Sequence, residues 1–336
     1  MKRKNNLWKK GAKLMVMAPM DDVTDVAFRQ MFARYGVGRA KYLPKYLANI
    51  LPAKKQFISF TEFVSADGLS LADAKGKEKL LKKLHFKRNE HPIVAQIFGS
   101  DIVRLKEAAK LVEALGFDGV DINMGCPDRS VEKTGSGAAL IKNPELARKI
   151  VLALKEAVQI PVSAKTRLGY GSIDFEWIEQ ILAAKPAALT VHLRTRKEMS
   201  KVDAHWDVVE SLIKIRDKAS PETALVANGD IKSLKEAEEK LKEFKGLDGV
   251  MVGRGLFGNP LFFLGIKPSK KEKIILLQEH LRLFEKYLLG VKSYAVMKKH
   301  FKAYISDFKG AGDLRARLMQ TENPEEALKI LKNARD

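Results

Sequence analysis

The sequence predicts an α/β fold, a (β/α)8 TIM barrel followed by a C-terminal α-helical domain. Eight short apolar runs end at turn residues, and segments with helical spacing lie between most of them. Eight strand–helix units within about 250 residues are typical of this barrel. A doubly wound sheet is the main alternative, but it would carry a GxGxxG motif after its first strand, and this chain has none there. The runs cover residues 14–20, 57–64, 92–99, 119–125, 161–169, 188–194, 224–230 and 249–255.

The segments between the strands carry helix signals of their own. Residues 101–116 and 233–246 have apolar side chains at helical spacing and close at a glycine, and residues 143–158 have the same spacing. After residue 267 the strand signal stops, and four amphipathic segments follow one another. We therefore predict three parts: a basic N-terminal arm over 1–13, a barrel over 14–267 and a helical domain over 268–336.

The composition indicates the cellular environment of the protein and the class of its partners. The 336 residues include 61 Lys and Arg against 41 Asp and Glu, a formal net charge of +20 that favours a polyanion such as nucleic acid. A Lys-rich surface that only aids solubility is the alternative, because many lysines pair with glutamates on helix faces. No apolar run approaches the ~20 residues of a membrane span. The single cysteine permits neither an internal disulfide nor a CxxC metal site, so we expect a cytoplasmic protein without a metal.

Polar side chains gather where the predicted strands end. In a (β/α)8 barrel these ends share one face, and the active site lies there. Each such residue alone would fit a satisfied strand end or a helix cap, but their occurrence at all eight ends predicts a site. The set comprises Met20, Asp21, Glu62, Gln96, Asn123, Cys126, Lys165, Arg167, His192, Arg194, Asn228, Asp230 and Arg254.

Two glycine-bearing strand ends predict a phosphate site. ANGD at 227–230 and VGRG at 252–255 follow the seventh and eighth strands, where barrels often bind phosphate through backbone N–H groups. Arg254 would add a charge-assisted contact. Tight turns are the alternative reason for the glycines. The phosphate would belong either to a substrate or to a cofactor such as FMN.

Lys165 favours FMN. A lysine on the fifth strand could stabilise negative charge on the N1 and C2-oxygen side of a reduced isoalloxazine ring. It could equally form a Schiff base with a carbonyl substrate. Gln96 and His192 would hydrogen-bond the ring edge or the phosphate, although either could also be a buried polar residue with satisfied partners.

Taken together, these motifs resemble the flavin-dependent tRNA-dihydrouridine synthases. The likeness spans roughly residues 14–260 in the order that the family shows, and residues 297–318 resemble its C-terminal helical domain. The combination of NMGCP, APM and the glycine pairs is highly specific. The motifs are APMDDVTDVAFR (18–29), AQIFGSD (95–101), DINMGCPDRSVEKTGSGAALIKNP (121–144), SAKTRLG (163–169), VHLRTR (191–196), ANGDI (227–231) and GVMVGRG (249–255).

The resemblance implies an FMN-dependent oxidoreductase that reduces specific uridines in tRNA to 5,6-dihydrouridine, with NADPH as the reductant. Hydride would reach C6 of the uracil from the flavin. Asn123 would position the uracil, and we assign Arg167 and Arg194 to substrate binding as well. The implied cofactor-binding residues are Pro19, Met20, Asp21, Gln96, Lys165 and His192 around the ring and ribityl chain, and Asn228, Gly229, Asp230, Gly253 and Arg254 at the tail and phosphate.

Cys126 lies in a Gly-Cys-Pro turn, and the resemblance implies that it donates a proton to C5 of the uracil. A general acid must carry its proton, and an unperturbed thiol with a pKa of about 8.5 does so at pH 7. We therefore expect Cys126 to lie outside any strongly electropositive pocket, which would lower its pKa. A small buried hydrophobe is the alternative for an isolated cysteine.

A uridine within folded tRNA must be flipped out of its stack to reach a barrel mouth, and phosphate contacts elsewhere would offset that cost. We expect the helical domain to make such contacts, together with a solvated N-terminal arm. Leu193 stands where the family often has a small residue, so we expect it near the flavin. The candidate backbone contacts are Lys298, Lys299, His300, Lys302, Arg315 and Arg317.

Two other functions fit parts of these observations. An FMN barrel oxidoreductase acting on a free pyrimidine or small metabolite would share Lys165 and the phosphate site, but would need neither the excess charge nor the helical domain. A tRNA-binding chaperone without chemistry would need no flavin. Against these two alternatives, we expect a monomeric protein whose partner is tRNA.

Overall fold

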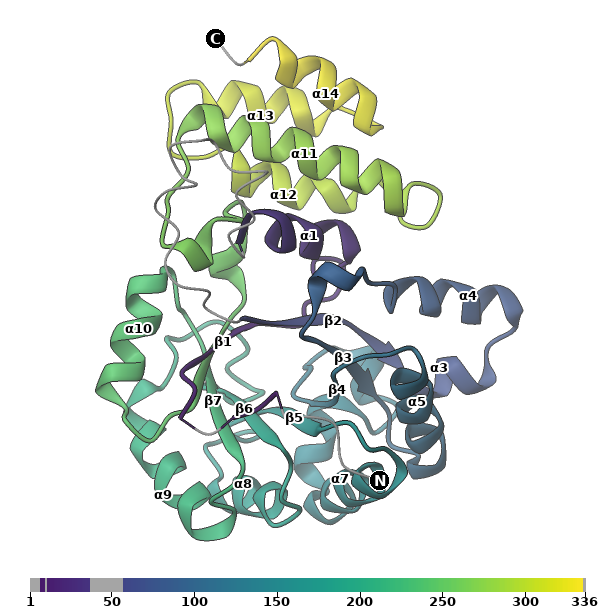
Figure 1. The fold of residues 1–336 in the computed structure, drawn as a ribbon, viewed down its shortest axis with the longest axis vertical. Helices are drawn as coiled ribbons and strands as arrows, with labels where there is room; N and C mark the ends of the chain where they lie inside the picture. Colours follow the sequence, from purple (N-terminus) through teal and green to yellow (C-terminus); the bar gives the residue numbers. More distant parts are fainter. Residues whose placement is uncertain (1–6, 10, 37–56, 335–336) are drawn as a thin grey trace.

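A computed structural model describes residues 7–9, 11–36 and 57–334, and its centre is a closed barrel of eight parallel strands. All eight predicted strands are confirmed (Figure 1). Most end earlier than predicted, because the polar and glycine residues at their ends turn into the loops of the mouth. The strands are β1 Leu14–Met17, β2 Phe57–Ser65, β3 Ile93–Phe98, β4 Gly119–Met124, β5 Val162–Arg167, β6 Ala188–His192, β7 Ala224–Asn228 and β8 Gly249–Val252.

Parallel pairing runs around the whole barrel, and β8 pairs with β1 to close it. The closing register sets Leu14 against Gly249 and Met17 against Val252. Because side chains alternate along a strand, one set points into the barrel and the other points toward the surrounding helices. The inward set is largely apolar away from the mouth, with Leu14, Val16, Ile58, Phe60, Val94, Ala188, Ala224, Val226 and Met251 packed together.

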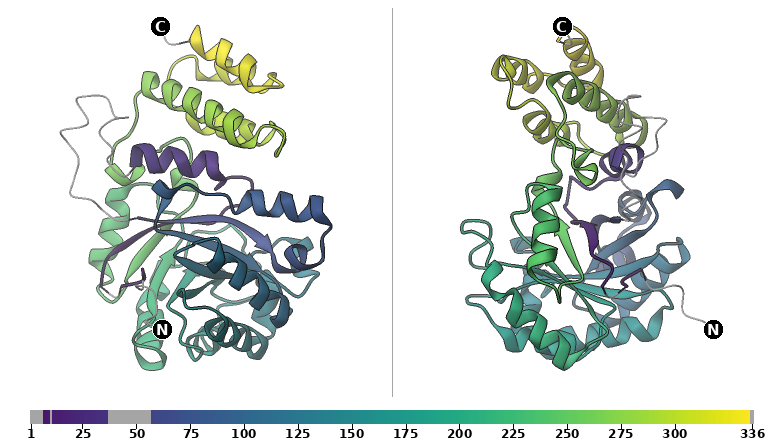
Figure 2. Two further views of the ribbon diagram at one scale, coloured as in Figure 1. Left: turned by 45° about the vertical axis from the view of Figure 1, so that its right-hand side comes forward. Right: turned by 60° about the vertical axis from the view of Figure 1, so that its left-hand side comes forward.

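Helices surround the barrel, as the two views of Figure 2 show. They are α1 Val26–Met31, α3 Ala66–Leu71, α4 Ala74–Lys83, α5 Ile102–Ala114, α6 Arg129–Glu132, α7 Pro144–Ala157, α8 Phe175–Leu182, α9 Val209–Ala219 and α10 Leu234–Glu243. The predicted helices that became α5, α7 and α10 begin where Asp101, Asn143 and Ser233 accept hydrogen bonds from first-turn N–H groups. Among the described residues, no helix combines the length and the apolar character that a bilayer crossing requires.

The C-terminal residues form a further layer of helices stacked on one side of the barrel (Figures 1 and 2). The first of them begins at a capping box of Ser269 and Glu272, next to the predicted boundary at residue 268. It packs against α1, so this helical layer is in direct contact with the barrel. The helices are α11 Lys270–Leu288, α12 Val296–Tyr304, α13 Ala311–Met319 and α14 Pro324–Lys332.

One residue of the N-terminal segment, Trp8, is not solvated as we expected of this arm. Residues 1–6 and 10 of that segment lie outside the described residues. Trp8, however, is 1% exposed and packs against Phe60, with ring centroids 6.2 Å apart. Gly11 N–H donates to Asp248 Oδ1 at 2.8 Å. Trp8 therefore plugs the end of the barrel opposite the mouth, because burying an indole removes a large apolar surface from water, whereas residues 9 and 11–13 are exposed.

An aromatic cluster joins the helical layer to the barrel. His280 of α11 and His300 of α12 pack edge to face with ring centroids 4.6 Å apart, and both rings contact Phe28 of α1. Both imidazoles are buried, and their Nδ1 atoms have no hydrogen-bond partner among the described residues. Burial lowers the pKa of His280 to about 3 and that of His300 well below its usual value. The expectation that His300 contacts RNA is therefore wrong, since it lies on the inward face of α12.

Acid should weaken this cluster. His280 is neutral in the folded protein down to a pKa of about 3, against an ordinary value of 6.5 in the unfolded chain. The folding stability that depends on the neutral His280 ring is therefore fully present above pH 6.5. It is lost as the pH falls from there toward 3, at about 1.4 kcal/mol per pH unit. We expect His280→Phe to reduce the slope of unfolding free energy against pH by about that amount between roughly pH 6 and pH 4. Urea unfolding at each pH measures the slope, and an unchanged slope would contradict this account.

Candidate active site

The carboxyl ends of the strands enclose a cavity of about 810 Å³. This volume suits a ligand of the size of a cofactor or drug molecule. The predicted residues that line it are Pro19, Met20, Lys165, His192, Arg194, Asn228, Gly229, Asp230, Gly253 and Arg254. The predicted residues outside this lining are Asp21, Glu62, Gln96, Asn123, Cys126 and Arg167.

Charged side chains form one wall of the cavity around Asp230. Its carboxylate accepts hydrogen bonds from Arg194 and, at 2.9 Å, from Arg254. The backbone N–H of Ala204 also donates to it at 2.9 Å. Asp230 has a φ of +54°, in the left-handed region that is uncommon for non-glycine residues but that Asp tolerates better than most. Arg194 is buried and held in place, whereas the exposed Arg254 has further donors with which to bind an anion.

Backbone N–H groups at the same wall are available to a ligand. Those of Gly229, Gly253 and Arg254 donate to none of the described residues. At Gly253 an added Cβ would come no closer than 3.5 Å to the Met20 sulfur, so packing does not require a glycine there. At Gly229 it would lie 2.6 Å from the Cβ of Ala204, so packing alone explains that glycine. Free N–H donors beside an arginine are the arrangement that binds phosphate.

Lys165 and His192 line the cavity from the neighbouring strands β5 and β6. Burial, helped by the nearby Arg167 charge, lowers the pKa of Lys165 to about 8, so most of it remains an ammonium at pH 7. Burial and the surrounding cations lower the pKa of His192 well below its usual value, so its imidazole is neutral. Arg194 Nη1 lies 3.1 Å from His192 Nε2. Because a guanidinium can only donate, the proton of the neutral ring sits on Nδ1.

A chain of buried hydrogen bonds runs from inside the barrel to the Cys126 turn. Ser163 Oγ donates to Asp121 Oδ1 at 2.6 Å, and Gln96 Nε2 donates to Asp121 Oδ2 at 2.7 Å. Asn123 Nδ2 then donates to Gln96 Oε1 at 3.0 Å. The Cys126 backbone N–H donates to Asn123 Oδ1 at 2.9 Å. Because an ionised carboxylate can only accept, Asp121 sets the direction of both amides, and the Asn123 oxygen is committed to the turn.

Arg167 holds the same turn from the other side. Its Nε donates to the Gly125 carbonyl at 2.8 Å, and its Nη1 donates to the carbonyls of Thr195 and Met199 at 3.1 and 3.0 Å. The side chain is buried, and burial lowers its pKa to about 10, so it is still charged at pH 7. Arg167 therefore joins the loop after β4 to the loop after β6.

The Cys126 thiol is half-buried, and its environment favours the protonated form. Burial raises the pKa of the thiol, and the negative charges of Asp128 and Asp21 add to the rise. The Arg167 charge and the backbone N–H of Asp128 act in the opposite direction, but the net shift is upward. The direction agrees with the expectation for a general acid.

Asp21 and Leu193 lie away from the cavity lining. Asp21 is held at 2.7 Å by Lys83 of α4, so it belongs to the rim of the mouth and not to the cavity lining. Leu193 was expected near the flavin, but it is fully buried in the core outside the barrel. Strand periodicity explains Leu193, because the preceding His192 points inward and its neighbour must point outward.

Several residues that shape the site were not predicted. Asp121 and Ser163 occupy inward positions on β4 and β5, and the alternation of the strands was the signal that could have identified them. Arg196 forms an ion pair with Glu132, which ties the loop after β6 to the helix that follows the Cys126 turn. That pair has no local sequence signal, because its two members come from separate loops.

The fold and its mouth define a (β/α)8-barrel enzyme. The sequence matches the family described as Dihydrouridine synthase (Dus) over residues 16–336. It is 38% identical over 334 residues to the probable tRNA-dihydrouridine synthase of Staphylococcus aureus strain N315, covering 98% of this chain and 95% of that relative. The probable tRNA-dihydrouridine synthase 2 of Bacillus subtilis strain 168 is also 38% identical, over 332 residues, 97% of this chain and 95% of that one. The chain belongs to the dihydrouridine synthase family, and the resemblance inferred from its motifs is confirmed.

Solved structures support the fold. A complex of 2-naphthoyl-CoA reductase with 2-naphthoyl-CoA aligns with a TM-score of 0.51 and 14% sequence identity, over 74% of this chain and 49% of that one. At this identity the likeness shows a shared barrel fold and nothing about the ligand.

The buried chain that ends at Cys126 can be tested at Asp121. Asp121→Leu leaves the Gln96 amide and the Ser163 hydroxyl without their acceptor, so we expect a loss of about 2–5 kcal/mol in the free energy of unfolding. Asp121→Asn should cost under about 1.5 kcal/mol, because its oxygen can accept from Gln96 while its NH2 donates to the Ser163 hydroxyl. Urea unfolding measures both losses. Equal losses in the two variants would show that volume, and not hydrogen bonding, matters at this position.

Proposed function

We propose that the protein reduces uridines of tRNA to 5,6-dihydrouridine, with FMN as its cofactor and NADPH as its reductant. The observation that carries this proposal is the juxtaposition, at one barrel mouth, of an anion-binding wall, an ammonium and a thiol that retains its proton. The names of the relatives favour this reaction over the reduction of a free pyrimidine or small metabolite.

The residues present suit FMN. Arg254 and the N–H groups of Gly229 and Gly253, which donate to no described residue, would hold its phosphate. Lys165 and the Nδ1–H of His192 are the donors that line the cavity from β5 and β6, and Lys165 would stabilise negative charge on a reduced ring. Bound FMN would supply the hydride that C6 of the uracil accepts.

Cys126 would donate the proton that C5 of the uracil takes up as the C5–C6 double bond is reduced. The thiol bond to hydrogen breaks, a C5–H bond forms, and water later returns a proton to the thiolate. The raised pKa favours this role over that of a nucleophile, which must be ionised. Asn123 and Arg167 would keep the turn in place, and the free Nδ2 hydrogen of Asn123 leaves it one donor for the substrate.

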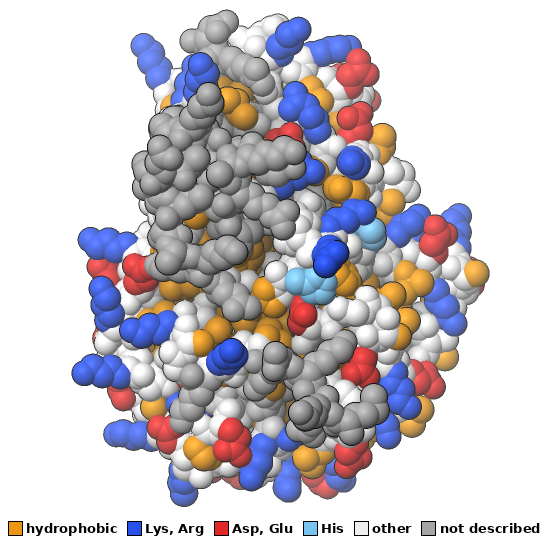
Figure 3. Space-filling view, viewed as in Figure 1, with side chains coloured by type: hydrophobic (Ala, Val, Ile, Leu, Met, Phe, Trp, Pro, Cys, Tyr) orange, Lys and Arg blue, Asp and Glu red, His pale blue; other side chains and the backbone are white. Residues whose placement is uncertain are grey.

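The helical layer offers a surface for the phosphates of tRNA. A groove of about 460 Å³ between α12 and α13 is lined by Lys298, Lys299, Lys302 and Arg315. On the face that Figure 3 shows, Lys and Arg side chains lie over both the barrel and the helical layer. Contacts of this kind would offset the few kcal/mol needed to flip a uridine into the mouth. Arg317 is exposed on α13 and remains a further candidate.

The remaining parts of the proposal concern the cell and the assembly. We propose further that the protein acts as a monomer. A tRNA substrate and a thiol that must stay reduced both fit the cytoplasm.

Replacement of the thiol tests the chemistry. Cys126→Ala should bind FMN and oxidise NADPH as the parent does, because the cavity lining is untouched. Dihydrouridine formation should fall by roughly 100-fold or more, since positioned general acids contribute about that much. Single-turnover assays on unmodified tRNA measure the product. Formation at the parent rate would exclude Cys126 as the acid, and a parent protein that binds no FMN would overturn the proposed function.

Charge reversal in the groove tests the tRNA surface. Lys298→Glu with Lys302→Glu, one turn apart on α12, should weaken tRNA binding and lower the slope of log Kd against log salt by about 1.5–2. The matched control is Lys214→Glu with Lys218→Glu, two exposed lysines at the same spacing on α9 with the same change in net charge. Filter binding at several salt concentrations measures both pairs. Equal effects would mean that only the overall charge matters.

A further inference from the structure

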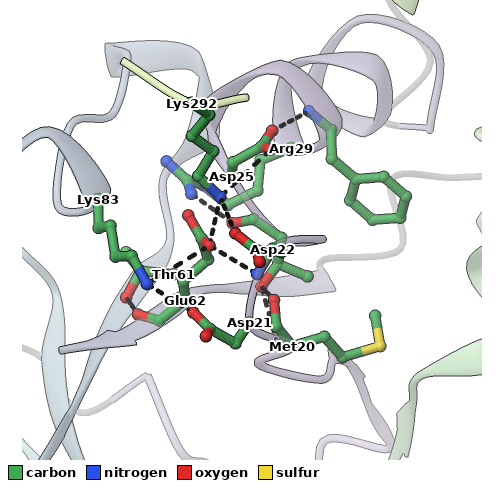
Figure 4. A network of polar contacts seen from close by, with 11 residues as sticks. Met20, Asp21, Asp22, Asp25, Arg29, Thr61, Glu62, Lys83 and Lys292 are labelled. Carbon is green, nitrogen blue, oxygen red and sulfur yellow. Dashed lines mark hydrogen bonds and ion pairs between the residues drawn. The ribbon is translucent and has the colours of Figure 1, made fainter. Parts of the chain in front are cut away.

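Lys292 extends from the helical layer into the mouth of the barrel. It lies in the connector between α11 and α12, and its side chain is only 9% exposed. Its Nζ lies 2.5 Å from Glu62 Oε1, 3.1 Å from Asp22 Oδ1 and 3.7 Å from Asp25 Oδ2 (Figure 4). Glu62 comes from the end of β2, and the two aspartates come from the segment between β1 and α1.

The same contacts hold the turn that follows β1. Glu62 Oε1 accepts the Lys292 ammonium and also the backbone N–H of Asp22 at 2.8 Å. Asp22 has a φ of +54°, in the left-handed region that is uncommon for non-glycine residues but that Asp tolerates better than most. One carboxylate oxygen therefore ties the ammonium of the helical layer to the backbone of this turn of the barrel.

This turn is continuous with the wall of the cofactor cavity. Thr24 N–H and Oγ1–H both donate to the Met20 carbonyl, at 2.9 and 3.1 Å, and the Met20 N–H donates back to Thr24 Oγ1 at 3.0 Å. Pro19 and Met20 line the cavity directly. A shift of Asp22 would therefore move the Met20 side of the cavity.

Lys292 is the main counter-charge of these carboxyl groups. Burial raises the pKa of Asp25 and of Glu62, and the Asp25 charge adds to the rise at Glu62, whereas Lys292 opposes both. Glu62 Oε2 is buried without a partner among the described residues. The other cations nearby offset less of the negative charge of these carboxylates. Lys83 is 4.0 Å from Glu62 and is bonded to Asp21, Lys299 acts on Asp22 only through the longer-range field, and the Arg29 guanidinium is taken up by Glu90, Thr24 O and His85 O.

We propose that Lys292 is a positioning residue through which the helical layer fixes the β1–α1 turn, and with it the Pro19–Met20 wall of the cavity. The inference rests on the proposed FMN site and adds to it a dependence on the helical layer. Without the ammonium, three carboxylates with little compensation would repel one another, and the turn would move away from its cavity-lining position.

Lys292→Met keeps the unbranched shape and most of the length of the side chain and removes its charge. We expect its Kd for FMN, measured by flavin fluorescence at about pH 8, to rise by about tenfold, the size of a typical coupling between contacting groups. In the protein without FMN, hydrogen–deuterium exchange should accelerate in peptides covering residues 18–25 and stay unchanged in β4 to β7. The matched control is Lys286→Met, an exposed lysine of α11, for which neither quantity should change.

Two further measurements separate positioning from general damage. Adding Glu62→Gln to Lys292→Met removes the charge that lies between Asp22 and Asp25 but keeps an acceptor for Asp22 N–H, so FMN affinity should recover to within about threefold of the parent. Lowering the pH to about 6 should narrow the gap between variant and parent, because protonation of the carboxylates replaces the missing charge.

An FMN affinity within about twofold of the parent, with unchanged exchange over 18–25, would overturn the proposal. So would a loss that neither Glu62→Gln nor acid relieves, or an exchange increase spread evenly over the barrel. A parent protein that binds no FMN would instead defeat the proposed function, and the exchange comparison would still test whether Lys292 holds the turn.

Discussion

The pairing of β8 with β1 closes the sheet, and the position of every side chain in the mouth depends on that closure. Eight parallel strands in a ring bring all their carboxyl ends to one rim, so residues more than 200 positions apart become neighbours. Side-chain alternation then divides the interior into layers. Apolar residues such as Val16 and Phe60 fill the part distant from the mouth, with Trp8 as a plug, and the polar layer above them includes Lys165 and Asn228. The apolar layer excludes water from the space beneath the polar layer. This exclusion strengthens the electrostatic interactions within the polar layer.

That polar layer has two sides with opposite chemistry. Around β6 to β8 the cations Arg194 and Arg254 and free backbone N–H groups favour an anion. Around β4 the Cys126 thiol lies where burial and two nearby aspartates outweigh Arg167, so an acid can keep its proton close to a positive cavity. Arg167 helps to keep these two sides separate, because its guanidinium donates hydrogen bonds to carbonyl oxygens of two loops. Through its Nε and Nη1 this cation holds the turn, and Arg167 is not among the residues that line the anion-binding wall.

Strand and helix periodicity predicted the whole barrel, because each element carries its pattern in consecutive residues. It also predicted most of the cavity lining, since strand ends in a closed barrel must converge. Leu193 was predicted to lie near the flavin, although the alternation of side chains after the inward-facing His192 indicates that Leu193 points away from the barrel interior. His300 and Trp8 were misplaced because a basic neighbourhood suggested exposure, whereas packing against Phe28 and Phe60 decided their burial. The ion pairs of Lys292 lie beyond any local pattern, since they join segments from the two ends of the chain.

The helical layer packs on α1 and holds the turn before it, so this layer is part of the site. Phe28 of α1 is covered by His280 and His300, and the turn before α1 is held by Lys292. Removing the chain beyond residue 268 would therefore uncover an apolar surface and leave Glu62 and its neighbours without their main counter-charge. A truncated protein would lose activity whether or not its helices bind tRNA, because the cavity wall itself depends on them. Point changes in the groove between α12 and α13, which leave the aromatic cluster and Lys292 intact, are what distinguish RNA binding from cavity support.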